Sequence, residues 1–384
     1  MKSGPRSRAF PSAPRGRATA AFIAAAIGAT ILSTALPLRG PAAADETAGS
    51  PVRPFRADSP WNKPLTADAR FTPAPDFRGY HVGLTGWVPN GGNVALLTAQ
   101  ASDPLRNILY HPRAWEAVAA GSWSRHGNPP DVERLIRATA EDRFPFAGNV
   151  YSTQVPGRAW NTVPDGFPSG LGEAGNRPPR RTSSHVPKGA KPASDGDGHT
   201  AIFQPDGRVL ELYAPIFLEN GDIVCLMYGF TDARRGRGIG EENGRRASMI
   251  PNYAGVLRGS HLDGGIDHAL ALVVPAKLLA PAWVFPAFAF DTATSRYAGA
   301  LPMGARLALP PDQDPDALAL ETPLGKILAR TARSHGFIVV DQGGDGISLV
   351  TEDASKRPEF TAWNADVEKD LLTIFSLLKI VAPP

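Results

Sequence analysis

The sequence predicts a mainly β (α+β) protein with a β-sandwich or jelly-roll-like body and a few peripheral helices. Short apolar runs recur between residues 199 and 310, and turn residues rather than helical patterns separate them. The chain also has 39 glycines and 38 prolines, which is above average usage and indicates many turns and long loops. Helical periodicity is confined to a few segments, so helices are expected around the β body rather than inside it.

The strand-like runs are bounded by two turn signals. Pro205-Asp206-Gly207 fits a three-residue hairpin loop with its glycine in the left-handed conformation, and Asn220-Gly221 is the strongest short hairpin signal. The runs are residues 199–203, 208–218, 222–230, 266–275, 283–291 and 305–310.

Three segments carry helix signals. The clearest is 322–336, where Thr322 is placed as the cap, Pro323 as the first helical residue and Gly336 as the stop. The other expected helices are 131–142 and 361–381, and residues 336–353 are expected to form a further hairpin.

The chain is expected to hold one domain after an export signal. Residues 1–44 begin with basic side chains, continue through the apolar run 20–36 and end on three alanines, which is typical of a cleaved secretory signal peptide. An uncleaved membrane anchor is the alternative. An extended lead-in over 45–60 and a single β-rich domain over 61–384 are expected to follow, the domain being loop-rich over 61–195, a β core over 196–310 and α/β over 311–384.

Charge and cysteine content narrow the class of protein. The whole chain has 40 basic and 37 acidic residues, but the first 44 residues hold six of the basic and none of the acidic ones. The mature chain is therefore slightly acidic, which does not favour a nucleic-acid partner. We expect a secreted protein, periplasmic or extracellular, without stable membrane insertion.

Cys225 is the only cysteine, so no intramolecular disulfide forms. The apolar run around it predicts a small buried side chain.

The Pro205-Asp206-Gly207 loop sets the register of the hairpin around it. That register places Ala201 opposite Glu211 and His199 opposite Tyr213, so that His199, Glu211 and Tyr213 share one face of the hairpin. The opposite face, with Thr200, Ile202, Leu210 and Leu212, is the better core side. A carboxylate in an otherwise apolar strand is costly to bury unpaired, which favours a functional or networked role for Glu211.

A second polar cluster lies in residues 245–275. Arg258, His261, Asp263, Asp267 and His268 fall within eleven residues, before or at the start of a strand. A histidine moves protons near neutral pH and an arginine binds a carboxylate in a two-pronged contact. We therefore expect this cluster to pack beside the hairpin and to contribute Arg258 and His268 to one site.

Two other motifs allow a functional interpretation but are explained as well by ordinary surface structure. Asp195, Asp197, His199 and His268 match no strong zinc or calcium spacing, so no metal and no cofactor is predicted. Residues 234–246 carry five arginines on a glycine-rich stretch. They are expected to form a solvated loop. The alternative is a lid that binds an acidic polymer.

Several motifs together resemble a group of secreted, mostly uncharacterised bacterial and fungal proteins. They are "SPWNKPL", "DGHTAIFQPDGRVLELYAP", "RASMIPNYAGVLRGSHLDGGIDHALAL", "LPMGARLALP" and "SHGFIVVDQGG", in this order. The resemblance implies that the recurring histidine, glutamate and second histidine of that group correspond to His199, Glu211 and His268. The position of His261 is often acidic in the group, and the resemblance implies no particular reaction.

The leading functional hypothesis is a secreted enzyme that cleaves polysaccharide, the substrate chain being its expected partner. The leading chemistry is that of a glycoside hydrolase, in which Glu211 acts with a second carboxylate, either Asp197 or Asp267, and the lyase is the alternative. In a polysaccharide lyase acting on an acidic glycan, His199 or His268 and Tyr213 move protons while Arg258 neutralises a uronate carboxylate. Trp160 and Tyr253 are added as substrate-binding residues beside Arg258 and Asp267.

A non-catalytic glycan-binding surface protein is the alternative from another class. In that case exposed aromatic residues on a β face carry the sugar contacts, and Trp61, Trp87 and Trp160 are the candidates. An esterase-type hydrolase is a weaker option, because no G-x-S-x-G motif is present.

Overall fold

The protein is described here from a computed structural model. The structure describes residues 53–85, 93–110, 181–193, 198–225, 227–242, 244–290, 296–353 and 358–382. These residues belong to one compact unit that runs from Asp45 to Pro384. The predicted signal peptide, the predicted helix over 131–142, and Trp87, Asp195, Asp197 and Trp160 lie outside the described residues.

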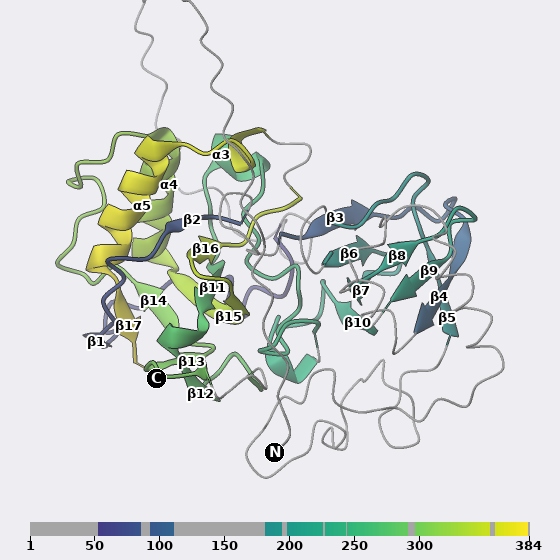
Figure 1. Cartoon of the computed structure of the whole chain (residues 1–384), viewed down its shortest axis with the longest axis horizontal. Coiled ribbons are helices and arrows are strands. Elements are labelled where there is room, and N and C mark those ends of the chain that lie inside the picture. Colours follow the sequence, from purple (N-terminus) through teal and green to yellow (C-terminus); the bar gives the residue numbers. More distant parts are fainter. Residues whose placement is uncertain are drawn as a thin grey trace, which may run out of the picture. The chain divides into compact units, whose positions relative to one another are not determined.

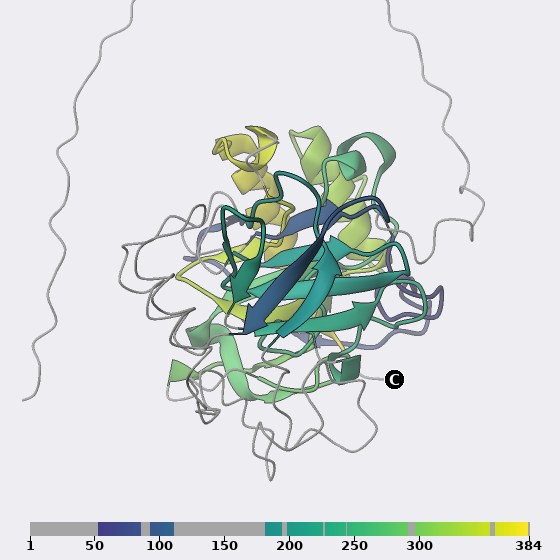
Figure 2. The same cartoon turned by 90° about the vertical axis from the view of Figure 1, so that its right-hand side faces the viewer.

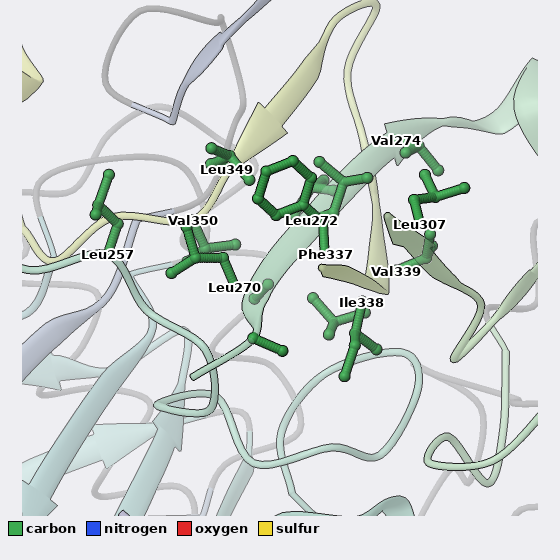
Figure 3. Close-up of a cluster of buried hydrophobic side chains, with 14 of the residues drawn as sticks. Leu257, Leu270, Leu272, Val274, Leu307, Phe337, Ile338, Val339, Leu349 and Val350 are labelled. Atoms are coloured by element: carbon green, nitrogen blue, oxygen red, sulfur yellow. The ribbon is translucent and has the colours of Figure 1, made fainter. Parts of the chain in front are cut away.

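The prediction of a mainly β protein with few helices is confirmed, and the largest sheet has seven strands. Its interior strand β11 (Leu270–Pro275) is buried along its whole length, pairing in parallel with β15 and antiparallel with β16. Leu270, Leu272 and Val274 pack there with Phe337 and Val339 (Figure 3). In order across the sheet, the strands are β1 (Phe71–Pro73), β17 (Lys379–Val381), β14 (Arg306–Ala308), β15 (Phe337–Gly343), β11, β16 (Ile347–Leu349) and β2 (Val82–Leu84).

The hairpin predicted over residues 336–353 is wrong. Both of its strands exist, as β15 and β16, but β11 lies between them and pairs with each. The glycine-rich turn does reverse the chain. A third, wholly apolar strand from an earlier part of the sequence lies between them, because it can bury both of its faces there.

Two helices pack against each other beside this sheet (Figure 1). Helix α4 (Pro323–Ser334) begins as predicted, since the Thr322 side chain accepts a hydrogen bond from the amide of Gly325 at 2.9 Å. Helix α5 (Ala365–Leu377) is shorter than predicted, because Asn364 caps it and its last apolar residues form β17. The other helical elements are α3 (Ser260–Gly264) and the 3₁₀ turns η1 (Gly240–Glu242), η2 (Ala276–Leu278) and η5 (Pro358–Phe360). Within the described ranges, no helix is both long enough and apolar enough to span a bilayer.

Two four-stranded sheets form a sandwich, whose strands face the viewer in Figure 2. Ile202, Leu210 and Leu212 of the first sheet share a buried cluster with Ile108, Ile223 and Cys225 of the second. Cys225 is therefore buried, as predicted. The first sheet is β10 (Met227–Asp232), β7 (Arg208–Tyr213), β6 (Thr200–Phe203) and β3 (Ala95–Thr98); the second is β5 (Arg181–His185), β4 (Leu105–Tyr110), β9 (Ile223–Cys225) and β8 (Ile216–Phe217); β12 (Leu279–Trp283) pairs with β13 (Leu301–Met303) apart from both.

The predicted hairpin register is confirmed. Ala201 lies opposite Glu211 in the β6–β7 ladder, and the rings of His199 and Tyr213 meet two residues further along, with centroids 5.1 Å apart. Gly207 closes the turn at φ 90°, in the left-handed region that the Pro-Asp-Gly loop requires.

Both faces of this hairpin are buried. The face that carries Glu211 also carries Ala201, Phe203 and Val209, and these belong to the main core rather than to the sandwich interior. The predicted polar face therefore looks onto the segment that connects β10 to β11, not onto solvent.

That connecting segment is held in place by close packing at Gly255, which gives a first prediction. Gly255 has φ 64°, and a Cβ built on it would lie 2.2 Å from the Trp61 ring and 2.6 Å from the amide nitrogen of Ala271. Gly265 also has positive φ, 79°, but a Cβ there meets nothing within 4 Å. Gly255→Ala is expected to cost about 3 kcal/mol in the free energy of unfolding, since backbone strain and overpacking add. Gly265→Ala is expected to cost only about 1 kcal/mol from strain. Urea denaturation of the two variants measures the difference, and equal costs would refute the crowding.

Candidate functional site

Glu211 is the centre of a buried hydrogen-bond network. Its Oε2 accepts the amide of Asn252 at 2.7 Å and the amide of Arg245 at 3.2 Å, while its Oε1 accepts the hydroxyl of Thr231 at 2.7 Å. Residues 245 and 252 are the two ends of one loop. A single carboxylate oxygen therefore holds both ends of that loop against the hairpin.

The carboxylate of Glu211 is fully buried, at 0% exposed. Burial raises its pKa, while the Asn252 and Thr231 hydrogen bonds and the positive charge of Arg245 act in the opposite direction. The Arg245 guanidinium lies over Gly229, the residue opposite Glu211 on β10, where any Cβ would collide with it. Arg245 is 4% exposed and Arg246 5% exposed. The prediction that residues 234–246 form a solvated loop is therefore wrong at this end.

The network continues from Glu211 to Tyr253. The Thr231 hydroxyl, which donates to Glu211, lies 3.0 Å from the hydroxyl of Tyr253. The Tyr253 ring stacks on Phe55 and meets the edge of Phe203, with centroids 5.2 and 5.3 Å away. Burial raises the pKa of Tyr253 well above its usual value, so its hydroxyl stays protonated at neutral pH.

Tyr253, Arg258 and His268 line one small cavity. Its volume is about 10 Å³, enough for roughly one water molecule. The remaining lining residues are Pro54, Phe55, Trp61, Asn62, Gly255 and Val256. The amide of Asn62 donates to the carbonyls of residues 54, 55 and 56, so this side chain organises the wall.

Arg258 places a positive charge at this cavity. The residue is 8% exposed, and its Nη2 has no hydrogen-bond partner among the described residues. Burial lowers the pKa of Arg258 to about 10, and the charge of Glu352 opposes that shift, so the guanidinium remains protonated at neutral pH. A buried guanidinium with an unpaired N–H favours an anionic oxygen as its neighbour.

His261 and His268 form a neutral pair whose proton positions follow from their contacts. Nδ1 of His261 accepts the amide of Arg258 at 3.1 Å, so its proton is on Nε2. Nδ1 of His268 lies 2.8 Å from the carbonyl of Ala269 and must donate, which leaves its Nε2 as an acceptor. The two Nε2 atoms lie 3.3 Å apart, so His261 donates to His268. Burial lowers the pKa of His261 to about 3 and that of His268 to about 4.

Two further groups lie near this pair. Asp267, predicted as a second carboxylate or substrate-binding residue, has a side chain 67% exposed and contacts Arg53 at 3.5 Å. His335 is 8% exposed, and burial, together with the histidine at 268, lowers its pKa to about 4.

The predicted site residues thus fall into three sets. Arg258, Tyr253 and His268 share the cavity, whereas the sequence predicted one site in which Arg258 and His268 join the hairpin residues. Glu211 reaches it only through Thr231 and Tyr253, and no second carboxylate accepts or donates a hydrogen bond to it in the part of the chain that the structure describes. His199 and Tyr213 form their own ring contact and are 4% and 5% exposed.

The residues that sequence reasoning missed come from distant segments. Trp61, interpreted as an anchor or as a sugar-binding aromatic, is 1% exposed and packs in the cavity wall. Arg245 and Thr231 both interact with the Glu211 carboxylate, but nothing in the sequence around either residue indicates this contact. Among the described residues, no three His, Cys, Asp or Glu side chains lie close enough together to hold a metal ion.

The geometry defines a mainly β protein with a buried arginine–histidine–tyrosine cavity. Comparison of the chain with protein-family models, with curated proteins and with solved structures finds no match.

Proposed function

We propose that this protein is an exported enzyme that cleaves an acidic polysaccharide by β-elimination. The observation that carries the proposal is the shared cavity of Arg258 and His268, with Arg258 Nη2 lacking a partner among the described residues. A guanidinium suits a uronate carboxylate, and a neutral imidazole suits the removal of a proton from the adjacent carbon.

The roles follow from the protonation states. Arg258 binds the uronate carboxylate and makes the proton on C5 more acidic by withdrawing charge. The cavity holds about one water molecule, so the substrate enters by widening it and displacing His261. His268 then accepts that proton on Nε2, a double bond forms between C4 and C5, and the C4–O bond breaks. Tyr253, whose raised pKa keeps it protonated, donates a proton to the leaving oxygen. The substrate's own carboxylate raises the pKa of His268 and so makes it a better base.

The glycoside hydrolase, which the sequence favoured, has less support in this arrangement. A glycosidase needs two carboxyl groups that both reach the sugar. The oxygens of Glu211 accept three hydrogen bonds from the protein, and Asp267, the other described candidate, is exposed and contacts Arg53. These contacts support a structural role for Glu211, which holds the loop that carries Tyr253.

The cleavage reaction can be tested on a panel of uronate polymers. Elimination gives an unsaturated product that absorbs ultraviolet light, whereas hydrolysis gives reducing ends without that absorbance. Arg258→Lys and His268→Gln are each expected to lower kcat/KM by about 10²–10⁴-fold. The matched control is Arg330→Lys, because Arg330 pairs with Asp316 on the exposed surface of α4.

The outcomes separate the functional classes. Reducing ends without absorbance would support the hydrolase, and binding without any cleavage would support a glycan-binding protein. If both cavity variants fold and keep wild-type activity, this site is not the catalytic one. Circular dichroism and urea denaturation of each variant distinguish lost activity from lost folding.

A further inference from the structure

The arginine-rich segment 232–242 lies outside the cavity and presents basic groups at the surface. Arg234 and Arg235 are exposed and Arg237 is half-buried. None of the three makes an ion pair with a residue that the structure describes. Their guanidinium groups are therefore available to an external anion.

Two acidic side chains of this segment stabilise its own backbone conformation. Asp232 Oδ1 accepts the amides of Arg234 and Arg235, each at 2.8 Å. The carboxylate of Glu242 accepts the amides of Arg237 and Gly238. These carboxylates therefore accept hydrogen bonds from backbone N–H groups rather than from the guanidinium groups of the three arginines.

An exposed aromatic side chain lies beside Arg237. Phe285 is 54% exposed, and the guanidinium of Arg237 lies 5.6 Å from the centre of its ring. The turn that carries Phe285 is bound to the arginine-rich segment, since the amide of Gly240 donates to the carbonyl of Pro286 at 2.8 Å. The half-buried rings of Trp283 and Phe288 extend the aromatic surface, with centroids 5.3 Å apart.

This surface shares a wall with the cavity. Trp61 Nε1 donates to the carbonyl of Gly238 at 2.7 Å, and Ser59 Oγ donates to the carbonyl of Arg237 at 2.6 Å. Phe55 packs directly on Gly238, where a Cβ would lie 2.5 Å from its ring. Trp61 and Phe55 both line the cavity, so the surface and the cavity share these two side chains.

We propose that Arg237 and Phe285 form a surface subsite for a carboxylated sugar of the polysaccharide chain, with the exposed Arg234 and Arg235 close to Arg237 in the sequence. The proposal rests on the proposed function and extends it to a second sugar residue. A sugar ring has one face made largely of C–H groups, which packs on the exposed face of an aromatic ring. Its carboxylate pairs with the adjacent guanidinium. An aromatic surface beside an unpaired arginine fits an acidic sugar better than a neutral one, because only the acidic sugar satisfies both.

Affinity electrophoresis tests the subsite without requiring catalysis. The probes are polygalacturonate, polyglucuronate and alginate, each compared with its carboxyl-reduced, uncharged form. The variants are Phe285→Ala and Arg237→Ala. The matched controls are Trp363→Ala, an aromatic residue 64% exposed that hydrogen-bonds to Glu368 of α5, and Arg78→Ala, whose side chain is 82% exposed. Wild-type protein is expected to be retarded by at least one acidic probe and by none of the reduced forms.

The expected result is a 10-fold or greater loss of affinity in both subsite variants and no loss in the controls. If a probe is also cleaved, KM on the polymer is expected to rise about 10-fold while kcat stays unchanged. Wild-type affinity in the two variants, equal retardation by the reduced polymers, or no retardation by any probe would overturn the subsite. Cleavage with unchanged polymer affinity in the variants would overturn the subsite alone, whereas binding without cleavage would overturn the enzyme alone.

Discussion

Glu211→Ala is expected to lower the free energy of unfolding by about 3–5 kcal/mol, the cost of breaking a buried, charged network by removing one partner. The substitution leaves the amides of Arg245 and Asn252 and the hydroxyl of Thr231 without their acceptor in a site that is 0% exposed. It also removes the negative charge beside the buried Arg245 guanidinium, which then has to be accommodated without it.

Urea denaturation measures this loss of unfolding free energy, and two further variants serve as comparisons. Glu211→Gln keeps the volume and one acceptor oxygen, so its cost is expected to be intermediate. Glu241→Ala, an exposed glutamate on η1, is expected to change stability by no more than about 0.5 kcal/mol. Amide hydrogen exchange at residues 245 and 252 is expected to accelerate in Glu211→Ala. A cost below about 1 kcal/mol would mean that this carboxylate does not hold the loop.

The register of this hairpin was predictable because its determinants are local. Pro205-Asp206-Gly207 specifies the turn, and the turn specifies which residues stand opposite one another. The surroundings of Glu211 were not predictable in the same way. Its partners are backbone amides at residues 245 and 252, and every residue type offers such an amide, so no sequence pattern reveals them.

The same distinction applies to the rest of the molecule. Arg258 and His268 are close in sequence, and their convergence on one cavity could be anticipated. Trp61 and Phe55 join them from a segment about two hundred residues earlier, through bonds such as that from Trp61 Nε1 to Gly238. The hairpin prediction for residues 336–353 was wrong for a similar reason. Strand β11, which is distant in sequence, pairs with both β15 and β16 and so separates them.

Acidification is expected to destabilise the protein through its buried histidines. Burial lowers the pKa of His261 to about 3, and those of His268 and His335 to about 4, from 6.5. The unfolded chain therefore binds more protons than the folded one between pH 6.5 and about 4. The contribution of each histidine is fully present above pH 6.5 and is lost as the pH falls, at about 1.4 kcal/mol per pH unit.

Two glutamates act in the opposite direction. Burial raises the pKa of Glu211, and it raises that of Glu242 from 4.5 to about 7. Their protonation favours the folded state, so their contributions decline as the pH rises from 4.5 through their folded pKa values. Between pH 4.5 and 6.5, three histidines outweigh two carboxyl groups, and the net expectation is a stability that rises with pH.

Replacing one histidine isolates its contribution from this balance. His335→Gln removes a buried histidine that does not line the cavity, and the slope of unfolding free energy against pH between 4.5 and 6 is expected to fall by about 1.4 kcal/mol per pH unit. The control is His81→Gln, because the His81 side chain is 87% exposed and is hydrated in both states. Urea titrations at four or five pH values give both slopes. An unchanged slope in His335→Gln would show that this histidine is protonated equally in the folded and unfolded states, and that the acid sensitivity has another origin.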